Sequence, residues 1–433
     1  MNVDMLKVII PDNSLLTTHN SSLLNYLSII LLIALFLSAC VKVRQTEIKI
    51  KDENAVQPTR EGVKLYDTGK YEQALEKLSE PEEQATLPED KTKIADLLST
   101  GGFALLERKK FNTALRYYQN SLKINKTLDN KPGLINNYSY IAKIYTDLGK
   151  YEEGIKYFVE SLKIQKELKD KVGIVHNLNN VASLNGYLGN YQESMELLSE
   201  ALQISEEIDD ITQTAKTLIN LATINHNLRN YQISIEYLNR AYQIADEAKE
   251  QNLKAGALNL KGVVYRQQGD YQKALDNYLR ALEINKKLGL KTETALNLST
   301  IGELYKETGR YDKAIRYFQE SLNISETSEN KLITAANLNY SGEVRYKQKN
   351  YAEAIELYES SSRIFEELGF KDGIARTFNN IGYLKGEMKD FDSANDSFDK
   401  AIAIYKDLGD REWIRVSLFG RGLSYERKGD LSS

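Results

Sequence analysis

The sequence predicts an all-α solenoid made of nine helix pairs and a final half repeat. An aromatic residue recurs every 40 positions with no insertion or deletion. Nine residues before each aromatic the side chain is Gly or Ala, and seven residues after it the side chain is large and apolar. Small residues let two helices approach closely while large ones fill the groove beside them. The recurring aromatic positions are Tyr71, Phe111, Tyr151, Tyr191, Tyr231, Tyr271, Tyr311, Tyr351 and Phe391.

The repeated unit is clearest from Gly262 to Ile284, with the spacing G-x-x-Y and then G-x-Y-x-x-A-x-x-x-Y-x-x-A-L. This spacing resembles the tetratricopeptide repeat, and the resemblance runs from about residue 55 to the C-terminus. Each unit is about six residues longer than the usual 34 of that family. The run from Ile284 to Leu288 lengthens the second helix, and Gly289 ends it. The resemblance implies a right-handed superhelix of antiparallel helix pairs that binds proteins or peptides.

The repeats divide the chain into an atypical first repeat at 55–94, regular units at 95–414, and a half repeat or C-terminal cap at 415–433. We expect Pro81 to end the second helix of the first repeat early, because proline inside a helix removes a hydrogen bond and clashes with the preceding turn. The segment from Glu80 to Asp90 is then expected to be an irregular acidic connection. In the half repeat, Glu412 to Lys428 matches a tenth first helix. This helix could be a poor cap, could dock a partner, or could mark a shortened form of a longer protein.

Residues 1–39 are expected to be a lipoprotein-type signal peptide. The apolar stretch from Leu23 to Leu37 has the length of a signal-peptide core rather than of a membrane span. The sequence Leu37-Ser38-Ala39-Cys40 resembles the bacterial lipobox, which implies that Cys40, the single cysteine of the chain, carries a lipid. An uncleaved anchor from Ser21 to Val43 is the alternative. Residues 40–58 are expected to form a flexible tether that holds the array at an inner or outer membrane, outside the cytoplasm of a bacterial cell.

Composition and motifs argue against catalysis and against nucleic-acid binding. The chain has 57 Lys and Arg against 61 Asp and Glu with the two signs interspersed, so no basic stripe is present for nucleic acid. Its three histidines include His176 and His226, which lie alone in different repeats without a partner at metal-ligand spacing. No phosphate-binding loop or nucleophile with a base is evident. We therefore expect a non-enzymatic protein with no metal, cofactor or small-molecule substrate.

The candidate binding residues come from the resemblance. In the tetratricopeptide family the first helices line a concave groove, and the contact positions lie next to the small residue of each first helix. Asparagine recurs there although it is a poor helix former, and its amide could pair with both polar groups of a peptide backbone. Alternatively, these asparagines bond the neighbouring repeat or reflect composition. The candidates are Asn179, Asn180, Asn220, Asn259, Asn339, Asn379 and Asn380, together with Arg266 and Lys306, which with His226 could select acidic groups.

Two functions are compatible with this sequence. The first is a scaffold that holds a protein or peptide partner at a bacterial envelope membrane through the lipid on Cys40. The alternative is the sensory input module of a signalling protein whose kinase-like output domain is missing or truncated. A structural spacer without a specific ligand is a third, less favoured, alternative.

Overall fold

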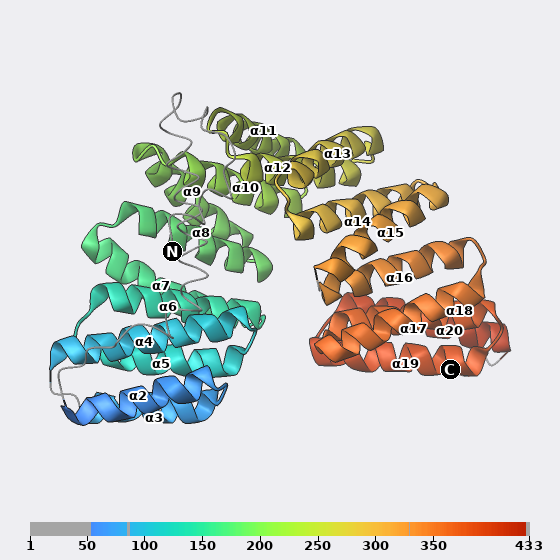
Figure 1. Cartoon of the computed structure of the whole chain (residues 1–433). Coiled ribbons are helices and arrows are strands. Elements are labelled where there is room, and N and C mark those ends of the chain that lie inside the picture. The colour runs from blue at the N-terminus through green and yellow to red at the C-terminus, as the bar shows by residue number, and fades with distance from the viewer. Residues whose placement is uncertain (1–52, 85–86, 329, 430–433) are drawn as a thin grey trace, which may run out of the picture. The chain divides into compact units, whose positions relative to one another are not determined.

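The computed structural model describes residues 53–84, 87–328 and 330–429, and within these ranges it contains 19 helices and no strand. The helices alternate along the chain as first and second members of antiparallel pairs (Figure 1). The first helices are α2 (Glu53–Asp67), α4 (Pro88–Glu107), α6 (Lys131–Asp147), α8 (Lys171–Tyr187), α10 (Ile211–Asn227), α12 (Gln251–Gln267), α14 (Lys291–Glu307), α16 (Lys331–Lys347), α18 (Lys371–Glu387) and α20 (Arg411–Lys428). The second helices are α3 (Tyr71–Gln84), α5 (Phe111–Thr127), α7 (Tyr151–Leu168), α9 (Tyr191–Glu207), α11 (Tyr231–Glu247), α13 (Tyr271–Lys287), α15 (Tyr311–Thr327), α17 (Tyr351–Leu368) and α19 (Phe391–Leu408).

The recurring aromatic residue is the first residue of every second helix, so the register predicted from the sequence is confirmed. Tandem helix pairs of this kind form an α-solenoid. Contacts divide the chain into two compact units, one ending at Asn190 and one beginning at Tyr191. Within these units each helix packs on its neighbour in sequence, and first helices of successive repeats also touch, as α4 touches α6 and α14 touches α16.

The small and large positions of a repeat meet inside each helix pair. A Cβ atom on Gly302 would lie 2.5 Å from Cε1 of Phe318, and one on Gly342 would lie 2.7 Å from Cε1 of Tyr358. Real Cβ contacts are not this short, so glycine is what allows the two helices to close on the aromatic ring. The predicted packing of small against large residues is therefore confirmed.

A residue in the left-handed conformation ends most helices. Gly149 has a φ of 72°, and the following Lys150 donates its backbone N–H to the carbonyl of Tyr145 at 2.8 Å. This bond satisfies a carbonyl at the helix end, as in a Schellman cap. The glycine exit predicted at Gly289 is confirmed by its φ of 70°. At other turns a non-glycine residue takes the same conformation, such as Lys169 with a φ of 57°.

Polar side chains are buried between successive repeats. The amide of Asn125 donates to Oδ1 of Asn137 at 2.8 Å, and Asn137 donates to Oγ of Ser99 at 2.9 Å. Asn285 and Asn297 repeat the first of these contacts at 2.5 Å in the second unit. The isoleucine that recurs near the end of each second helix is fully buried at Ile124 but only partly buried in later repeats, such as Ile164. In these later repeats the residue that directly follows the isoleucine is buried instead.

Two predictions for the first repeat need correction. The predicted tether extends to residue 58, but α2 already begins at Glu53, so residues 53–58 are helical. Pro58 is the sixth residue of α2, where proline removes one hydrogen bond of the helix. The second helix of the first repeat is shorter than the others, as predicted, but it does not end at Pro81, because α3 continues through this residue to Gln84. In the predicted irregular segment, residues 80–84 belong to α3 and residues 88–90 belong to α4.

The predicted tenth first helix is present as α20, which packs on α19 and α18. It exposes Leu418 and Phe419, with 42% and 66% of their surface accessible. The expectation that this helix carries apolar residues on more than one side is confirmed for these two. Residues 1–52, including the predicted signal peptide and Cys40, lie outside the part of the chain that the structure describes.

Candidate functional site

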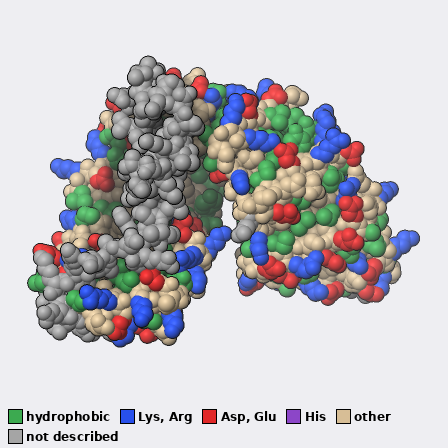
Figure 2. All heavy atoms as spheres, in the orientation of Figure 1, with side chains coloured by type: hydrophobic (Ala, Val, Ile, Leu, Met, Phe, Trp, Pro, Cys, Tyr) green, Lys and Arg blue, Asp and Glu red, His purple; other side chains and the backbone are tan. Residues whose placement is uncertain are grey.

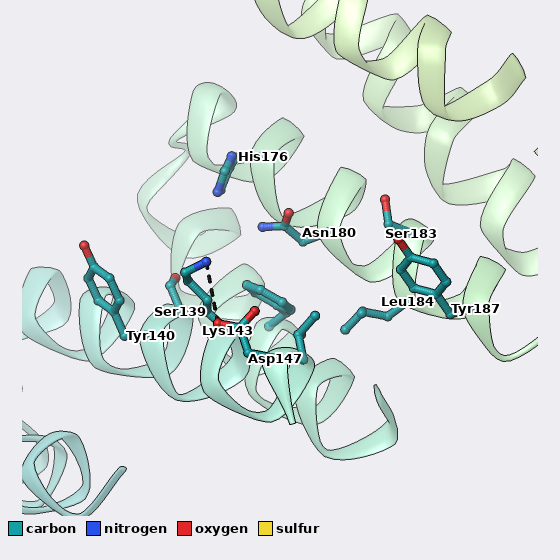
Figure 3. Close-up of a pocket in the computed structure, with 11 residues that line it drawn as sticks. Ser139, Tyr140, Lys143, Asp147, His176, Asn180, Ser183, Leu184 and Tyr187 are labelled. Carbon is teal, nitrogen blue, oxygen red and sulfur yellow. Dashed lines mark ion pairs between the residues drawn. The ribbon is translucent and has the colours of Figure 1, made fainter. Parts of the chain in front are cut away.

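A cavity in the first unit lies between the first helices α6 and α8 (Figure 3). It has a volume of 510 Å³ and combines polar, charged and aromatic side chains. His176 and Asn180 extend from α8 over a row of side chains on α6. The lining residues are Ser139, Tyr140, Lys143, Thr146, Asp147, Phe158, His176, Asn180, Ser183, Leu184 and Tyr187.

Asn180 places an available side-chain amide in this cavity. Its side chain is partly exposed, and its amide makes no hydrogen bond to another described residue. The neighbouring hydroxyls are engaged, since Ser183 donates to the carbonyl of Asn179 at 2.8 Å and Ser139 lies 3.2 Å from Oγ of Ser161. The cavity therefore offers one free amide, with a donor and an acceptor, between occupied neighbours.

Charge and aromatic surface flank that amide. Lys143 and Asp147 form an ion pair at 3.8 Å on the exposed surface of α6, shown by the dashed line in Figure 3. Tyr140 stacks on Tyr118 with ring centroids 5.0 Å apart, and burial raises the pKa of Tyr140, so its hydroxyl stays protonated. At the other end Tyr187 is 70% exposed and stacks on Tyr151. A ligand in this cavity would contact the aromatic rings of Tyr140 and Tyr187 and the ion pair of Lys143 and Asp147.

The second unit contains a comparable cavity of 320 Å³ between α14, α16 and α18. Exposed apolar side chains, Leu296, Leu332 and Phe370, lie at this cavity. Arg376 contributes a cation that pairs with Asp372 at 3.2 Å and lies over the ring of Trp413. Both cavities are thus lined mainly by first helices, which is where the sequence analysis placed ligand contacts.

Three of the seven predicted asparagines are buried, and the other four are partly exposed. Asn179, Asn339 and Asn379 are 7%, 6% and 2% exposed, and of these three only Asn339 lines a described cavity, that of the second unit. Asn179 donates to the carbonyl of Val175 in its own helix at 3.1 Å. The buried positions face the preceding turn and the adjacent repeat, so few of their polar atoms are free for a ligand.

Several predicted residues join neighbouring repeats. Asn259 accepts a hydrogen bond from Asn297 at 2.9 Å, and Asn339 accepts one from Asn380 at 3.1 Å. These contacts correspond to the alternative in which asparagine bonds the next repeat. Asn220 is partly exposed on α10 and also takes part in an interaction.

The two predicted cations are paired with carboxylates of the following repeat. Arg266 on α12 contacts Glu303 and Glu307 on α14, and Lys306 on α14 contacts Glu343 on α16. Each cation is only partly exposed. A ligand carboxylate would have to displace these internal partners, so selection of acidic ligands by Arg266 and Lys306 gains no support from their surroundings.

The remaining sequence-based expectations concern metals and membranes. Within the described residues no group of three or more His, Cys, Asp and Glu side chains is placed to hold a metal ion. His226 lies beside Asn227 and Tyr231 and does not line the cavity that contains His176. None of the described helices combines the length and the apolar character that a membrane span requires.

Comparison with known proteins decides the family. A model of the tetratricopeptide repeat matches residues 93–167, 134–207, 173–247, 253–327 and 332–407, which together cover most of the chain. The chain belongs to the tetratricopeptide repeat family. No curated protein matches it.

Solved tetratricopeptide structures share this fold at low identity. A signal transduction ATPase with numerous domains and a tetratricopeptide repeat sensor, from Pyrococcus horikoshii, aligns at 17% identity with a TM-score of 0.56, covering 79% of this chain and 50% of that one. Aspartyl phosphate phosphatase F from Bacillus subtilis aligns at 15% identity and 0.53, covering 86% and 97%. The apo form of the quorum sensor NprR from B. thuringiensis aligns at 17% and 0.52, covering 75% and 93%. The chain thus spans half the length of the archaeal protein, and the similarity shows the fold alone.

Some residues of this tetratricopeptide protein were missed by sequence reasoning. Tyr140 and Tyr187 were not singled out because neither position is aromatic in every repeat. Asn137 and Asn297 form the buried contacts between repeats, and asparagine also occupies this register at Asn177 and Asn337, a signal that could have been read from the sequence.

Proposed function

We propose that the chain is a non-enzymatic scaffold that binds an extended peptide segment of a partner protein against its first helices. Tetratricopeptide repeats fit a protein-binding scaffold in general. The finer proposal rests on the cavity between α6 and α8, where the free amide of Asn180 lies among the aromatic side chains of Tyr140 and Tyr187.

The chemistry of this cavity suits an extended backbone. A side-chain amide can accept from a peptide N–H and donate to a peptide carbonyl, whatever the peptide's sequence. Aromatic side chains at the two ends, Tyr140 and Tyr187, can cover apolar side chains of the ligand. The Lys143–Asp147 pair is exposed, so exchanging it for a ligand charge would involve little desolvation.

The surface charge supports a protein partner over nucleic acid. On the face shown in Figure 2, Lys and Arg side chains are interspersed with Asp and Glu side chains. The formal net charge of the chain is −4. Nucleic-acid binding requires cations that neutralise several successive phosphates, and the described residues on the face in Figure 2 show no such row.

Attachment to a bacterial envelope membrane through Cys40 is part of the proposal. It is supported by the sequence Leu37-Ser38-Ala39-Cys40 after the apolar stretch. We expect metabolic labelling with an alkyne fatty acid to label the wild-type chain and not the Cys40→Ser variant. Labelling of both chains, or a Cys40→Ser chain that still fractionates with membranes, would contradict the lipid anchor.

The sensory input module of a signalling protein is the second candidate. It is favoured by the similarity to the Pyrococcus protein, in which a tetratricopeptide repeat sensor is part of a larger signal-transduction ATPase. The scaffold and the sensory module would use the same binding surface. They differ in the consequence of binding, which is recruitment of the partner for the scaffold and a signal to an output domain for the sensory module.

Binding by Asn180 can be tested with a peptide array and the full chain in detergent. Peptides that bind would be labelled and titrated by fluorescence anisotropy against the wild type and the Asn180→Ala variant. We expect the variant to bind roughly tenfold more weakly, because one hydrogen-bonding amide is lost. Asn112→Ala is the matched control, since Asn112 is an exposed asparagine of the same unit outside this cavity. Equal binding by wild type and Asn180→Ala, or an equal loss in the control, would refute the assignment.

A further inference from the structure

A cluster of cations surrounds one tyrosine on the second unit, away from the two cavities described above. The ring of Tyr242 on α11 lies 5.1 Å from Nζ of Lys254, 6.0 Å from Nζ of Lys261 and 5.3 Å from Cζ of Arg280. Tyr242, Lys254, Arg280 and Lys287 line a cavity of 390 Å³ that Glu283 also lines, whereas Lys261 approaches the ring of Tyr242 without lining this cavity. The name Tyr242 cluster is used below for five residues from α11, α12 and α13, namely Tyr242, Lys254, Lys261, Arg280 and Lys287.

Part of the positive charge in the Tyr242 cluster lacks a compensating carboxylate. Lys254 pairs with Asp246 at 2.5 Å and Lys287 pairs with Glu283 at 2.6 Å. Lys261 instead donates to Oδ1 of Asn239 at 2.7 Å, and Arg280 donates to the hydroxyl of Tyr242 at 2.8 Å. Neither Lys261 nor Arg280 forms an ion pair with a described residue.

The electrostatic consequence appears at Lys261. Burial and, secondarily, the charge of Arg280 lower the pKa of Lys261 below its ordinary value. A lysine that is destabilised as a cation by a neighbouring cation is stabilised when an anion binds beside both. Binding of an anion would therefore stabilise the charged forms of these side chains.

We propose that the Tyr242 cluster binds a single phosphate group, carried by a small phosphate ester or by a phosphorylated side chain of a protein. A phosphate dianion has three acceptor oxygens and close to two charges, which matches several cations better than a carboxylate does. The guanidinium of Arg280 can contact two of these oxygens, and Lys254 and Lys287 can approach from α12 and α13.

The hydroxyl of Tyr242 adds a donor to the site. It accepts from Arg280, so its own hydrogen remains free to donate to an anion in the cavity. A single cluster of this size suits one phosphate rather than a nucleic-acid backbone, and the net charge of −4 agrees with this.

Lysine footprinting on the full chain tests the proposal at residue level. The chain would be acetylated with a limiting reagent at pH 8, with inorganic phosphate titrated against potassium chloride of equal ionic strength. We expect saturable protection of Lys254, Lys261 and Lys287, measured by mass spectrometry, and no protection of the exposed Lys400. Absence of protection, or equal protection by chloride, would overturn the proposal.

Variants at one register position supply the control. Arg280→Gln is expected to raise the phosphate concentration for half protection about tenfold or more, because a charge-assisted contact is lost. Arg240→Gln, one repeat earlier at the same register, removes an arginine already paired with Glu206 and should leave that concentration unchanged. If Arg280→Gln lowers only the melting temperature and leaves protection unchanged, the cluster is structural and the proposal is wrong.

The same footprinting assay with a phosphoserine peptide distinguishes a phosphoprotein from a small phosphate ester as the source of the phosphate. A phosphoserine peptide that protects at tenfold lower concentration than inorganic phosphate, while its unphosphorylated form does not, assigns the ligand to a phosphoprotein. Equal potency of peptide and phosphate assigns it to a small phosphate ester. Protection by an unphosphorylated peptide alone, or by a DNA oligonucleotide far more strongly than by phosphate, would overturn the proposal. The proposed peptide cavity on α6 and α8 is unaffected by any of these results.

Discussion

Gly262 and Tyr278 meet so closely that a Cβ atom on Gly262 would lie 2.4 Å from Cε1 of the tyrosine ring. The ring is fully buried and cannot move aside without displacing its neighbours. We expect Gly262→Ala to destabilise the second unit by about 1–3 kcal/mol, the usual cost of overpacking a core. The measurement is the shift of the urea unfolding midpoint, followed by circular dichroism.

Gly256 on the same helix is the matched control for this substitution. No atom lies within 4 Å of where its Cβ would be, so Gly256→Ala should stabilise α12 by about 0.5–1 kcal/mol through helix propensity. If both alanine variants shift the midpoint in the same direction, the contact between Gly262 and Tyr278 does not limit packing.

This contact also shows how far the sequence determines the fold. The alternation of small and large residues at a fixed period predicted which residues meet within a helix pair, because the pairing depends only on register. The turn at Lys169 was not predicted, since the left-handed conformation there is imposed by the helices that it joins rather than by a glycine.

The binding site was less predictable for a related reason. Asn180 was among the predicted contact residues and lies in the cavity, whereas its neighbour Asn179 is buried. Adjacent helix positions point in directions about 100° apart, so a small error in helix orientation exchanges a buried residue for an exposed one. Contacts such as that between Asn259 and Asn297 also depend on the angle between repeats, which the repeat pattern does not specify.

The buried pair of Asn285 and Asn297 provides a second prediction. Replacing one asparagine by alanine leaves the other amide buried without its partner, at a cost of about 1–3 kcal/mol. Replacing both removes this buried unsatisfied group and leaves only the partly exposed Asn259 without its donor, so the double variant should lose less stability than the sum of the single variants. We expect a coupling energy of about 0.5–3 kcal/mol in a double-mutant cycle measured by urea unfolding.

The preceding repeat shows that the double variant is structurally possible. The same two register positions are occupied there by Ala245 and Ala257, both fully buried. Additive losses in the cycle would mean that Asn285 and Asn297 act independently, contrary to the hydrogen bond between them.

Buried tyrosines predict a loss of stability in alkali. Burial raises the pKa of Tyr278 to about 12, and it raises the pKa values of Tyr118 and Tyr358 well above their usual range. Between pH 10 and 12 the unfolded chain loses these protons while the folded chain keeps them. The unfolded state then binds fewer protons, so the free energy of unfolding falls as pH rises, by up to about 1.4 kcal/mol per pH unit for each such tyrosine.

Urea unfolding at pH 8, 10 and 11 measures this effect, with Tyr358→Phe as the test variant. The side chain of Tyr358 is 1% exposed, and phenylalanine occupies the same register at Phe318 and Phe398. We expect the variant to be at least as stable as wild type at pH 8 and to lose less stability above pH 10. A parallel loss in both proteins would show that Tyr358 does not contribute to the alkaline transition.

The left-handed residue Lys169 offers a stabilising substitution. It ends α7 with a φ of 57°, a conformation that costs a residue with a Cβ atom about 1 kcal/mol and glycine almost nothing. Its exposed side chain makes no contact that the substitution would remove. We therefore expect Lys169→Gly to raise the melting temperature of the first unit, partly offset by the greater freedom of glycine in the unfolded chain.

The converse variant is Gly369→Ala, at the same register with a φ of 64°, which should lower stability by about 1 kcal/mol. A decrease for Lys169→Gly together with no change for Gly369→Ala would show that backbone strain at these turns does not limit stability.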